Sequence, residues 1–303
     1  MDSPLSEVVN VDSPEPKGLC VLNKQELSGK HSPRHNHILA ALPAADYARL
    51  LPDLELIPMR LGAAMYEAGG SLDYVYFPTT SVVSLLSELE DGTSAGIAVT
   101  GFDGLVGIAL FLGGDNTACR AVVRSAGFGY RIRASVGKRE FDLYGEFQRV
   151  VLLYTQVVIT QMALTAVCNR HHTLEQRLCR WLLLNLDCLP TNELTMTQES
   201  IAQMLGVRRE GVTEAAGDLR KAGTLCYNRG KITVLDRPRL EHRACECYAV
   251  VKKEMNRLLR YRSKPQGCPK ELSPTAFASK PGELPAHSMI SPPHLMKAHA
   301  SPR

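Results

Sequence analysis

The sequence predicts an α+β fold with three consecutive parts: a β-rich N-terminal domain, a long helix, and a C-terminal domain built on a helix-turn-helix with a hairpin wing. Three observations support this prediction. Short β-prone runs alternate with Gly- or Asp-containing turns in the first half of the chain, a long apolar segment with helical period follows, and two short amphipathic segments joined at a glycine come last. These patterns are typical of a sandwich or barrel followed by helices.

Six β-prone runs lie between Asp53 and Arg133, and their even spacing predicts a sandwich or barrel. They are LELIPM, YVYFP, VVSLL, AGIAV, CRAVVR and GYRIR. Asp91-Gly92 lies between the third and fourth runs. This pair predicts a tight hairpin in which both turn residues have positive φ.

The segment 146–170 predicts one long helix with two apolar sides. Val150, Leu153, Val157, Leu164 and Val167 form one stripe, and Leu152, Ile159 and Met162 lie on another side. We expect one side to meet the β-rich domain and the other to form a parallel homodimer interface. The alternative is a buried core helix in a monomer.

A shorter helix is predicted from Thr173 to Leu186, with Thr173 as its N-cap and His171-His172 as the bend before it. The predicted organisation then has five segments. They are a disordered tail at 1–34, a β-rich domain at 35–145, the dimerisation helix and hinge at 146–188, a helix-turn-helix domain with its wing at 189–262 and a disordered tail at 263–303.

The chain is expected to be cytoplasmic. Its opening is acidic and rich in proline, with no basic segment followed by an apolar one, so no secretory signal is predicted. The most apolar run is interrupted by Thr155, Gln156, Thr160 and Gln161, so no membrane span or membrane partner is predicted.

The nine cysteines indicate a reducing compartment and free thiols, because their number is odd and no C-x-x-C occurs. Cys245-x-Cys247 is the closest pair, and its spacing is unusual for zinc. His31, His35 and His37 fall at the edge of the predicted tail. We therefore predict no metal site.

Charge differs between the two halves. Residues 36–145 contain 8 Lys and Arg against 12 Asp and Glu, whereas residues 194–262 contain 14 against 8. A basic C-terminal module beside an acidic N-terminal one indicates that the C-terminal module meets a polyanion such as DNA.

The C-terminal module contains two short helical patterns. Thr197 can cap a first helix whose inward side is Ile201, Ala202 and Leu205, and Gly206 supplies the turn. A second helix begins near Arg208, and its buried positions are Val212, Ala215, Ala216 and Leu219. This pattern leaves Arg209, Glu210, Thr213 and Glu214 on the outer side, as a DNA-recognition helix requires.

The outer side chains have the chemistry of base contacts. Arg209 can donate two hydrogen bonds to guanine, and Glu210 can accept one from cytosine. Arg208, Thr197 and Gln198 are expected to contact phosphates. The runs TLCY and KITVLD flank Asn228-Arg229-Gly230 and predict a wing whose basic residues, Arg229 and Lys231, lie near the DNA backbone.

These motifs resemble the Crp/Fnr family, to which the cyclic-AMP receptor protein belongs. The resemblance covers about residues 36–262 and is carried by TQESIAQMLGVRREGVT, RGKITVLD and RHHTLEQRLCRWLLL. It implies a cupin-like β-roll related to cyclic-nucleotide-binding domains, a homodimer, double-stranded operators with two inverted half-sites, and RNA polymerase as a further partner. Arg209 and Glu210 match the family's base-contacting pair, but Glu214 stands where well-known members have a second Arg.

The sensor segment departs from the family pattern. Gly107 stands where cyclic-nucleotide-binding members have a Glu, and Cys119-Arg120-Ala121 matches their phosphate-binding segment with the Arg shifted by one residue. Gly107, Arg120 and Ala121 remain the candidate ligand residues, but no cyclic-nucleotide cofactor is predicted. The chain lacks the N-terminal cysteine cluster of the family's iron–sulfur sensors, because only Cys20 precedes the β-rich domain. No iron–sulfur centre is therefore predicted. Haem ligation by His35 or His37 stays an open alternative.

Two other classes of function compete with a DNA-binding regulator. One is a small-ligand-binding signalling module whose helix-turn-helix contacts only protein, against which the basic C-terminal charge argues. The other is an enzyme. No G-x-x-x-x-G-K-[ST], H-E-x-x-H or G-x-S-x-G motif occurs, so no catalytic residue is predicted.

Overall fold

The computed structural model describes residues 31–189, 191–228 and 230–259. The predicted tail at 263–303 lies outside these residues, as does most of the tail predicted at 1–34. Seven strands form the N-terminal domain: β1 (Glu55–Met59), β2 (Ala64–Tyr66), β3 (Tyr74–Pro78), β4 (Val82–Glu88), β5 (Ser94–Thr100), β6 (Cys119–Ser125) and β7 (Gly127–Arg133). Six match the predicted runs. The short β2 was not predicted.

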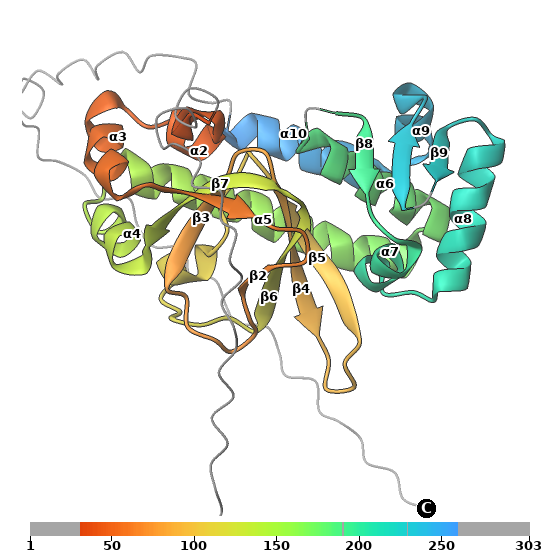
Figure 1. Cartoon of the computed structure of the whole chain (residues 1–303), viewed down its shortest axis with the longest axis horizontal. Helices are drawn as coiled ribbons and strands as arrows, with labels where there is room; N and C mark the ends of the chain where they lie inside the picture. The colour runs from red at the N-terminus through yellow and green to blue at the C-terminus, as the bar shows by residue number, and fades with distance from the viewer. Residues whose placement is uncertain (1–30, 190, 229, 260–303) are drawn as a thin grey trace, which may run out of the picture. The chain divides into compact units, whose positions relative to one another are not determined.

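The strands form two antiparallel sheets with a core between them (Figure 1). One sheet has the order β1-β7-β3 and the other the order β2-β6-β4-β5. Phe77 and Ile132 from the first sheet and Val83, Leu85 and Val123 from the second belong to one buried cluster. The N-terminal half is therefore a β-roll, and the α+β prediction is confirmed.

The hairpin between β4 and β5 differs in detail from its prediction. Gly92 has φ of 81°, but Asp91 does not have positive φ. The Gly92 N–H donates to Leu89 O (3.0 Å), and the Asp91 carboxylate accepts from the Thr93 N–H (2.9 Å). A four-residue turn at residues 89–92, with one left-handed glycine as its last residue, replaces the two-residue turn that we expected.

Short helices cover the ends of the β-roll. They are η1 (Pro33–His35), α2 (His37–Ala40), α3 (Ala44–Leu50), η2 (Leu51–Asp53), η3 (Ile108–Leu112) and α4 (Ala134–Phe141). The domain includes residues that we had placed in the tail, because the Tyr130 hydroxyl donates to His31 O and the Arg34 guanidinium stacks on Tyr47.

Helix α5 (Glu146–His171) is the longest element, and it has two different sides as predicted. Phe147, Val151, Tyr154 and Val158 are buried against the β-roll. Leu152, Ile159 and Val167 are 46%, 51% and 49% exposed. The sequence pattern placed Val167 in one stripe with Val150 and Val157, but these two residues are buried whereas Val167 is exposed.

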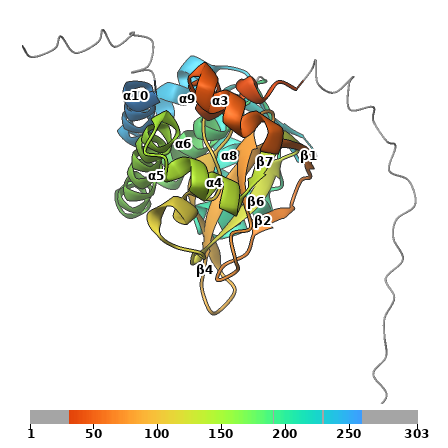
Figure 2. The same ribbon diagram turned by 90° about the vertical axis from the view of Figure 1, so that its left-hand side faces the viewer.

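The length and composition of α5 would also suit a membrane-spanning helix. In the structure, α5 packs along β5 and along α10 (Glu246–Leu259), and Figure 2 shows α5 and α10 side by side. The buried side chain of Gln161 pairs with the backbone of β5. The helix thus has the contacts of a core element of a folded domain.

The C-terminal half contains the remaining elements. They are α6 (Leu174–Asp187), β8 (Glu193–Thr195), α7 (Gln198–Leu205), α8 (Arg209–Lys221), β9 (Leu225–Asn228), β10 (Lys231–Val234) and α9 (Arg237–Arg243). Thr173 caps α6 in a capping box with Gln176, and the bend at His171-His172 occurs as predicted. The sheet order is β8-β10-β9, which adds an unpredicted strand to the wing.

We predict that Asn36→Ala destabilises the β-roll. The buried Asn36 side chain caps α2 through the Ile38 and Leu39 N–H groups and donates to Pro78 O (2.9 Å) and Gly104 O (2.7 Å). Leaving these groups unpaired should cost about 2–3 kcal/mol of unfolding free energy, measured by urea denaturation. The exposed Asn116→Ala is the control, and an equal change in both variants would contradict this role of Asn36.

Candidate nucleic-acid interface

The helix-turn-helix begins at a capped residue and turns at a glycine, as predicted. The Thr197 hydroxyl accepts a hydrogen bond from the Ser200 N–H (3.1 Å) at the start of α7. Gly206 ends α7 with φ of 60°, a left-handed conformation that side chains with a Cβ adopt at a cost. Helix α8 then starts at Arg209, with Arg208 in the N-cap position.

The two helices pack through the apolar positions that the sequence pattern predicted. Ile201, Ala202 and Leu205 of α7 are buried, together with Met204. On α8 the buried residues are Val212, Ala215, Ala216 and Leu219. This packing fixes which side of α8 faces away from the domain.

The side of α8 that faces solvent carries the candidate base-contacting residues. Arg208, Arg209, Glu210, Thr213 and Glu214 are all exposed. Arg208 is the N-cap of α8, and Arg209 and Glu210 are its first two residues. This end therefore presents strong donors and an acceptor together on one exposed surface.

Two of the predicted residues contact each other. The Thr213 hydroxyl lies 2.8 Å from Gln198 Oε1 and 3.1 Å from the Arg209 carbonyl oxygen. The bond to Gln198 holds the start of α7 against the outer side of α8. Gln198 thus supports the position of α8, a contact that the sequence did not indicate.

The wing, formed by β9 and β10, is hydrogen-bonded to Met196, just before the start of α7. The Tyr227 hydroxyl on β9 donates to Met196 O (3.0 Å), and burial raises the pKa of that hydroxyl. Lys231 on β10 forms a salt bridge with Glu193 on β8 (2.7 Å). Lys231 is therefore partly neutralised by a neighbouring strand. Arg229 lies outside the described residues.

The candidate ligand residues of the β-roll have different surroundings. Arg120 pairs with Glu67 (2.7 Å) and Glu88 (3.0 Å), whereas the neighbouring Ala121 is fully buried. Gly107 has φ of 107° and lies against the backbone of Tyr74. The charge of Arg120 is thus already balanced by two carboxylates, on the side of the strand away from Ala121.

A cavity lies between α2, α5 and α10. Its volume is about 490 Å³, within the range of small-molecule sites. Its lining includes His37, Phe102, Asp103, Leu153 and Lys252. Sequence analysis missed this cavity because its lining comes from segments more than 200 residues apart.

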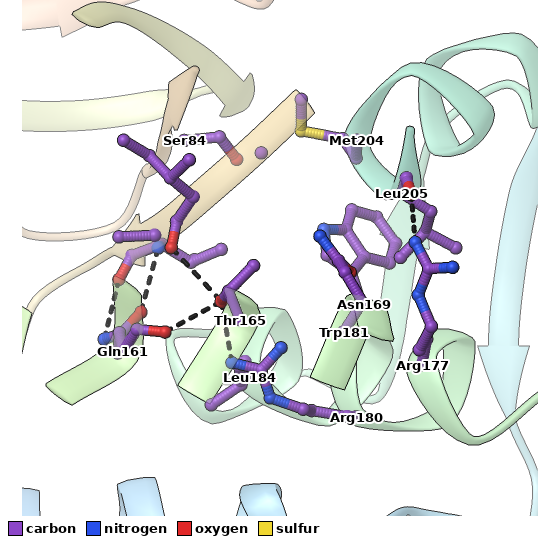
Figure 3. Close-up of a pocket in the computed structure, with 14 residues that line it drawn as sticks. Ser84, Gln161, Thr165, Asn169, Arg177, Arg180, Trp181, Leu184, Met204 and Leu205 are labelled. Carbon is purple, nitrogen blue, oxygen red and sulfur yellow. Dashed lines mark hydrogen bonds between the residues drawn. The ribbon is translucent and has the colours of Figure 1, made fainter. Parts of the chain in front are cut away.

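Hydrogen bonds connect the β-roll to the helix-turn-helix around the small cavity in Figure 3. The Gln161 side chain on α5 pairs with the backbone of β5, and the Thr165 hydroxyl donates to Gln161 O (2.8 Å). Arg180 of α6 donates to the Thr165 hydroxyl (3.0 Å), and Arg177 donates to Leu205 O at the end of α7. Polar contacts of α5 and α6 therefore lie between β5 and the helix-turn-helix.

Residues 176–243 match the family model of the Crp-like helix-turn-helix domain. A comparison with curated protein sequences gave no match.

Several solved structures share the fold. A putative transcriptional regulator of the Crp/Fnr family from Eubacterium rectale is 18% identical, covers 69% of this chain and 98% of its own, and has a TM-score of 0.56. FixK2 from Bradyrhizobium japonicum is also 18% identical and has the same TM-score, with 63% and 98% covered. The c-di-GMP-responsive regulator CLP from Xanthomonas campestris is 16% identical, with 63% and 99% covered and a TM-score of 0.52. At these identities the likeness shows the fold.

We predict that Thr197→Ala destabilises the helix-turn-helix, because the Ser200 N–H loses its acceptor. The expected loss of unfolding free energy is about 1 kcal/mol. Thr197→Ser keeps a hydroxyl at the same position and is the matched control. Urea denaturation followed by circular dichroism measures both, and equal losses would show that the cap does not stabilise α7.

Proposed function

The chain is of the Crp/Fnr type, with a Crp-like helix-turn-helix domain on the Crp/Fnr fold, and we propose that it regulates transcription by binding an inverted-repeat operator as a homodimer. One observation supports this proposal above all others. Helix α8 buries Val212, Ala216 and Leu219 and exposes Arg209 and Glu210 at its N-terminal end. These exposed groups complement a G·C pair in the major groove, because Arg209 can donate to guanine and Glu210 can accept from cytosine.

The proposal assigns roles to the exposed residues. Arg209 and Glu210 contact base edges, with Thr213 and Glu214 beside them on the same side of α8. Thr197, Gln198, Arg208, Arg229 and Lys231 contact or approach phosphates. Glu214 cannot donate to guanine, so the half-site should differ from that of relatives with Arg at this position.

The exposed side of α5 supports the homodimer. Its exposed positions include Leu152, Gln156, Ile159, Ala163 and Ala166, which recur at alternating steps of four and three residues. This is the spacing of a coiled-coil seam, and the two alanines allow a close approach of helices. Two α8 helices related by a two-fold axis would meet two inverted half-sites.

The proposal also includes where the protein acts, which partners it has and what its β-roll does. The protein acts in the cytoplasm without membrane contact, makes no chemical turnover and recruits or blocks RNA polymerase at its operator. The β-roll acts as the sensor of a signal. The paired charges of Arg120 do not favour a cyclic-nucleotide cofactor, and no iron–sulfur cofactor is proposed.

Selection from a random pool of duplex DNA tests the proposal. The purified full-length protein should enrich an inverted repeat whose half-site centres are about one helical turn apart. Affinity should fall steeply with rising salt, because phosphate contacts release counterions. Recovery of no enriched sequence, with no salt-dependent DNA binding, would favour a small-ligand-binding module without direct DNA contact.

We predict that Arg209→Ala weakens binding to the selected duplex by about 1–3 kcal/mol, which is about 5- to 150-fold in Kd. It should also relax the preference at one base pair, which a competition assay with single-base variants measures. Arg220→Ala, exposed in the last turn of α8, is the control. Equal losses by Arg209→Ala on selected and random DNA would reject the base-contacting role.

We predict that Ile159→Glu converts the dimer to monomers, because it places a charge in the apolar seam of α5. Analytical ultracentrifugation measures the change, and operator affinity should fall with it. Leu61→Glu, at an exposed leucine in the turn after β1, is the control. A wild-type protein that sediments as a monomer would contradict the homodimer.

A further inference from the structure

Four side chains with metal-binding chemistry converge where α5 ends. Cys168 and His172 come from the C-terminal end of α5, and Cys245 and Cys247 come from the junction of α9 and α10. Their ligand atoms all lie within 4.8 Å of one another. The three cysteines are buried, and the His172 side chain is 13% exposed. The cluster lies apart from the candidate DNA interface and from the cavity between α2, α5 and α10.

Two contacts within the cluster have the distances expected between ligands of one tetrahedral zinc ion. Cys168 Sγ lies 3.5 Å from Cys245 Sγ, and Cys247 Sγ lies 3.7 Å from His172 Nδ1. Zinc bonds of about 2.3 Å to sulfur and about 2.0 Å to nitrogen give ligand-to-ligand distances of about 3.5–3.8 Å in a tetrahedron. A disulfide would need about 2.05 Å between the sulfur atoms. Three cysteines and one histidine are an established structural zinc set.

Local structure holds both ligand pairs in place. The His172 N–H donates to Cys168 O (3.1 Å), which holds the C-cap residue His172 against the last turn of α5. Cys245 and Cys247 flank Glu246, the first residue of α10. The Tyr248 N–H donates to Cys245 O (3.1 Å), which fixes the turn that carries both thiols.

A carboxylate orients the histidine. His172 Nε2 lies 3.3 Å from Glu246 Oε1, while Nδ1 faces Cys247. A hydrogen on Nε2 that is donated to Glu246 leaves the Nδ1 lone pair directed into the cluster. Carboxylate–histidine pairs of this kind are the usual outer support of a histidine ligand.

Positive charge is available near the cluster, because Arg180 of α6 acts electrostatically on Cys168 and Cys247. Arg180 is itself buried, and its Nε has no hydrogen-bond partner among the described residues. Three thiolates around a divalent ion carry one net negative charge, which this guanidinium would balance.

We propose that Cys168, His172, Cys245 and Cys247 bind one Zn²⁺ ion. The ion joins the end of the dimerisation helix to the junction that follows the winged helix-turn-helix. The chain between His172 and Cys245 contains the four helices α6, α7, α8 and α9. The metal thus fixes both ends of the DNA-binding module against α5, a role that goes beyond the proposed function and does not depend on DNA binding.

Cobalt substitution of the full-length wild-type protein tests the site. Protein purified under reducing conditions and stripped with a chelator should bind one equivalent of Co²⁺ per chain. It should then show the intense visible bands of tetrahedral cobalt together with sulfur-to-cobalt charge transfer, and Zn²⁺ should displace the cobalt. The protein as isolated should contain about one zinc per chain by elemental analysis. A weak octahedral spectrum, or less than half an equivalent of metal, would overturn the proposal.

Matched cysteine variants assign the ligands. Cys247→Ala should lose about a third of the charge-transfer intensity or bind no cobalt, because one of three thiolates is removed. Cys179→Ala removes a buried thiol of α6 outside the cluster and should keep the full wild-type spectrum. An unchanged spectrum in Cys247→Ala would overturn the assignment.

Two further readouts separate a metal site from a thiol pair. Chelator should lower the melting temperature of the wild-type protein by more than that of Cys247→Ala, because metal bound to the folded state stabilises it and the variant has lost one ligand. Formation of a Cys168–Cys245 disulfide under mild oxidation, in a protein that binds no cobalt when reduced, would also overturn the zinc proposal.

Discussion

The rest of the structure depends on the position of helix α5, because three separate parts of the molecule are built on this one helix of 26 residues. Its inner side closes the core of the β-roll through Phe147, Tyr154 and Val158. Its outer side keeps Leu152 and Ile159 exposed, and its C-terminal end carries Cys168 and the C-cap residue His172. A shift of this helix would therefore move the β-roll, the exposed seam and the hinge together.

The polar contacts of α5 connect the β-roll to the C-terminal half of the chain. Gln161 satisfies the backbone of β5, and Thr165 accepts from Arg180 on α6. Helix α7 also packs directly on β5. Because buried polar groups are costly to leave unpaired, these contacts hold β5, α6 and α7 together. They link the β-roll physically to the helix-turn-helix.

Sequence alone predicted the elements whose pattern is local. The caps at Thr173 and Thr197 and the buried positions of α8 follow from residues within one or two turns of each other. Features set by distant contacts escaped prediction. The exposure of Val167 and the three-residue strands β2 and β8 depend on neighbours far along the chain. The grouping of Cys168, His172, Cys245 and Cys247 escaped for the same reason, although Cys168 and His172 form a second pair with helical spacing.

The structure of the full-length protein bound to its selected duplex tests the central claim most directly. The account predicts that the α8 helices of two protomers lie in successive major grooves about 34 Å apart, with Arg209 and Glu210 within hydrogen-bond distance of base edges. A complex in which another surface contacts the bases, or in which Arg209 and Glu210 point away from the DNA, would contradict it.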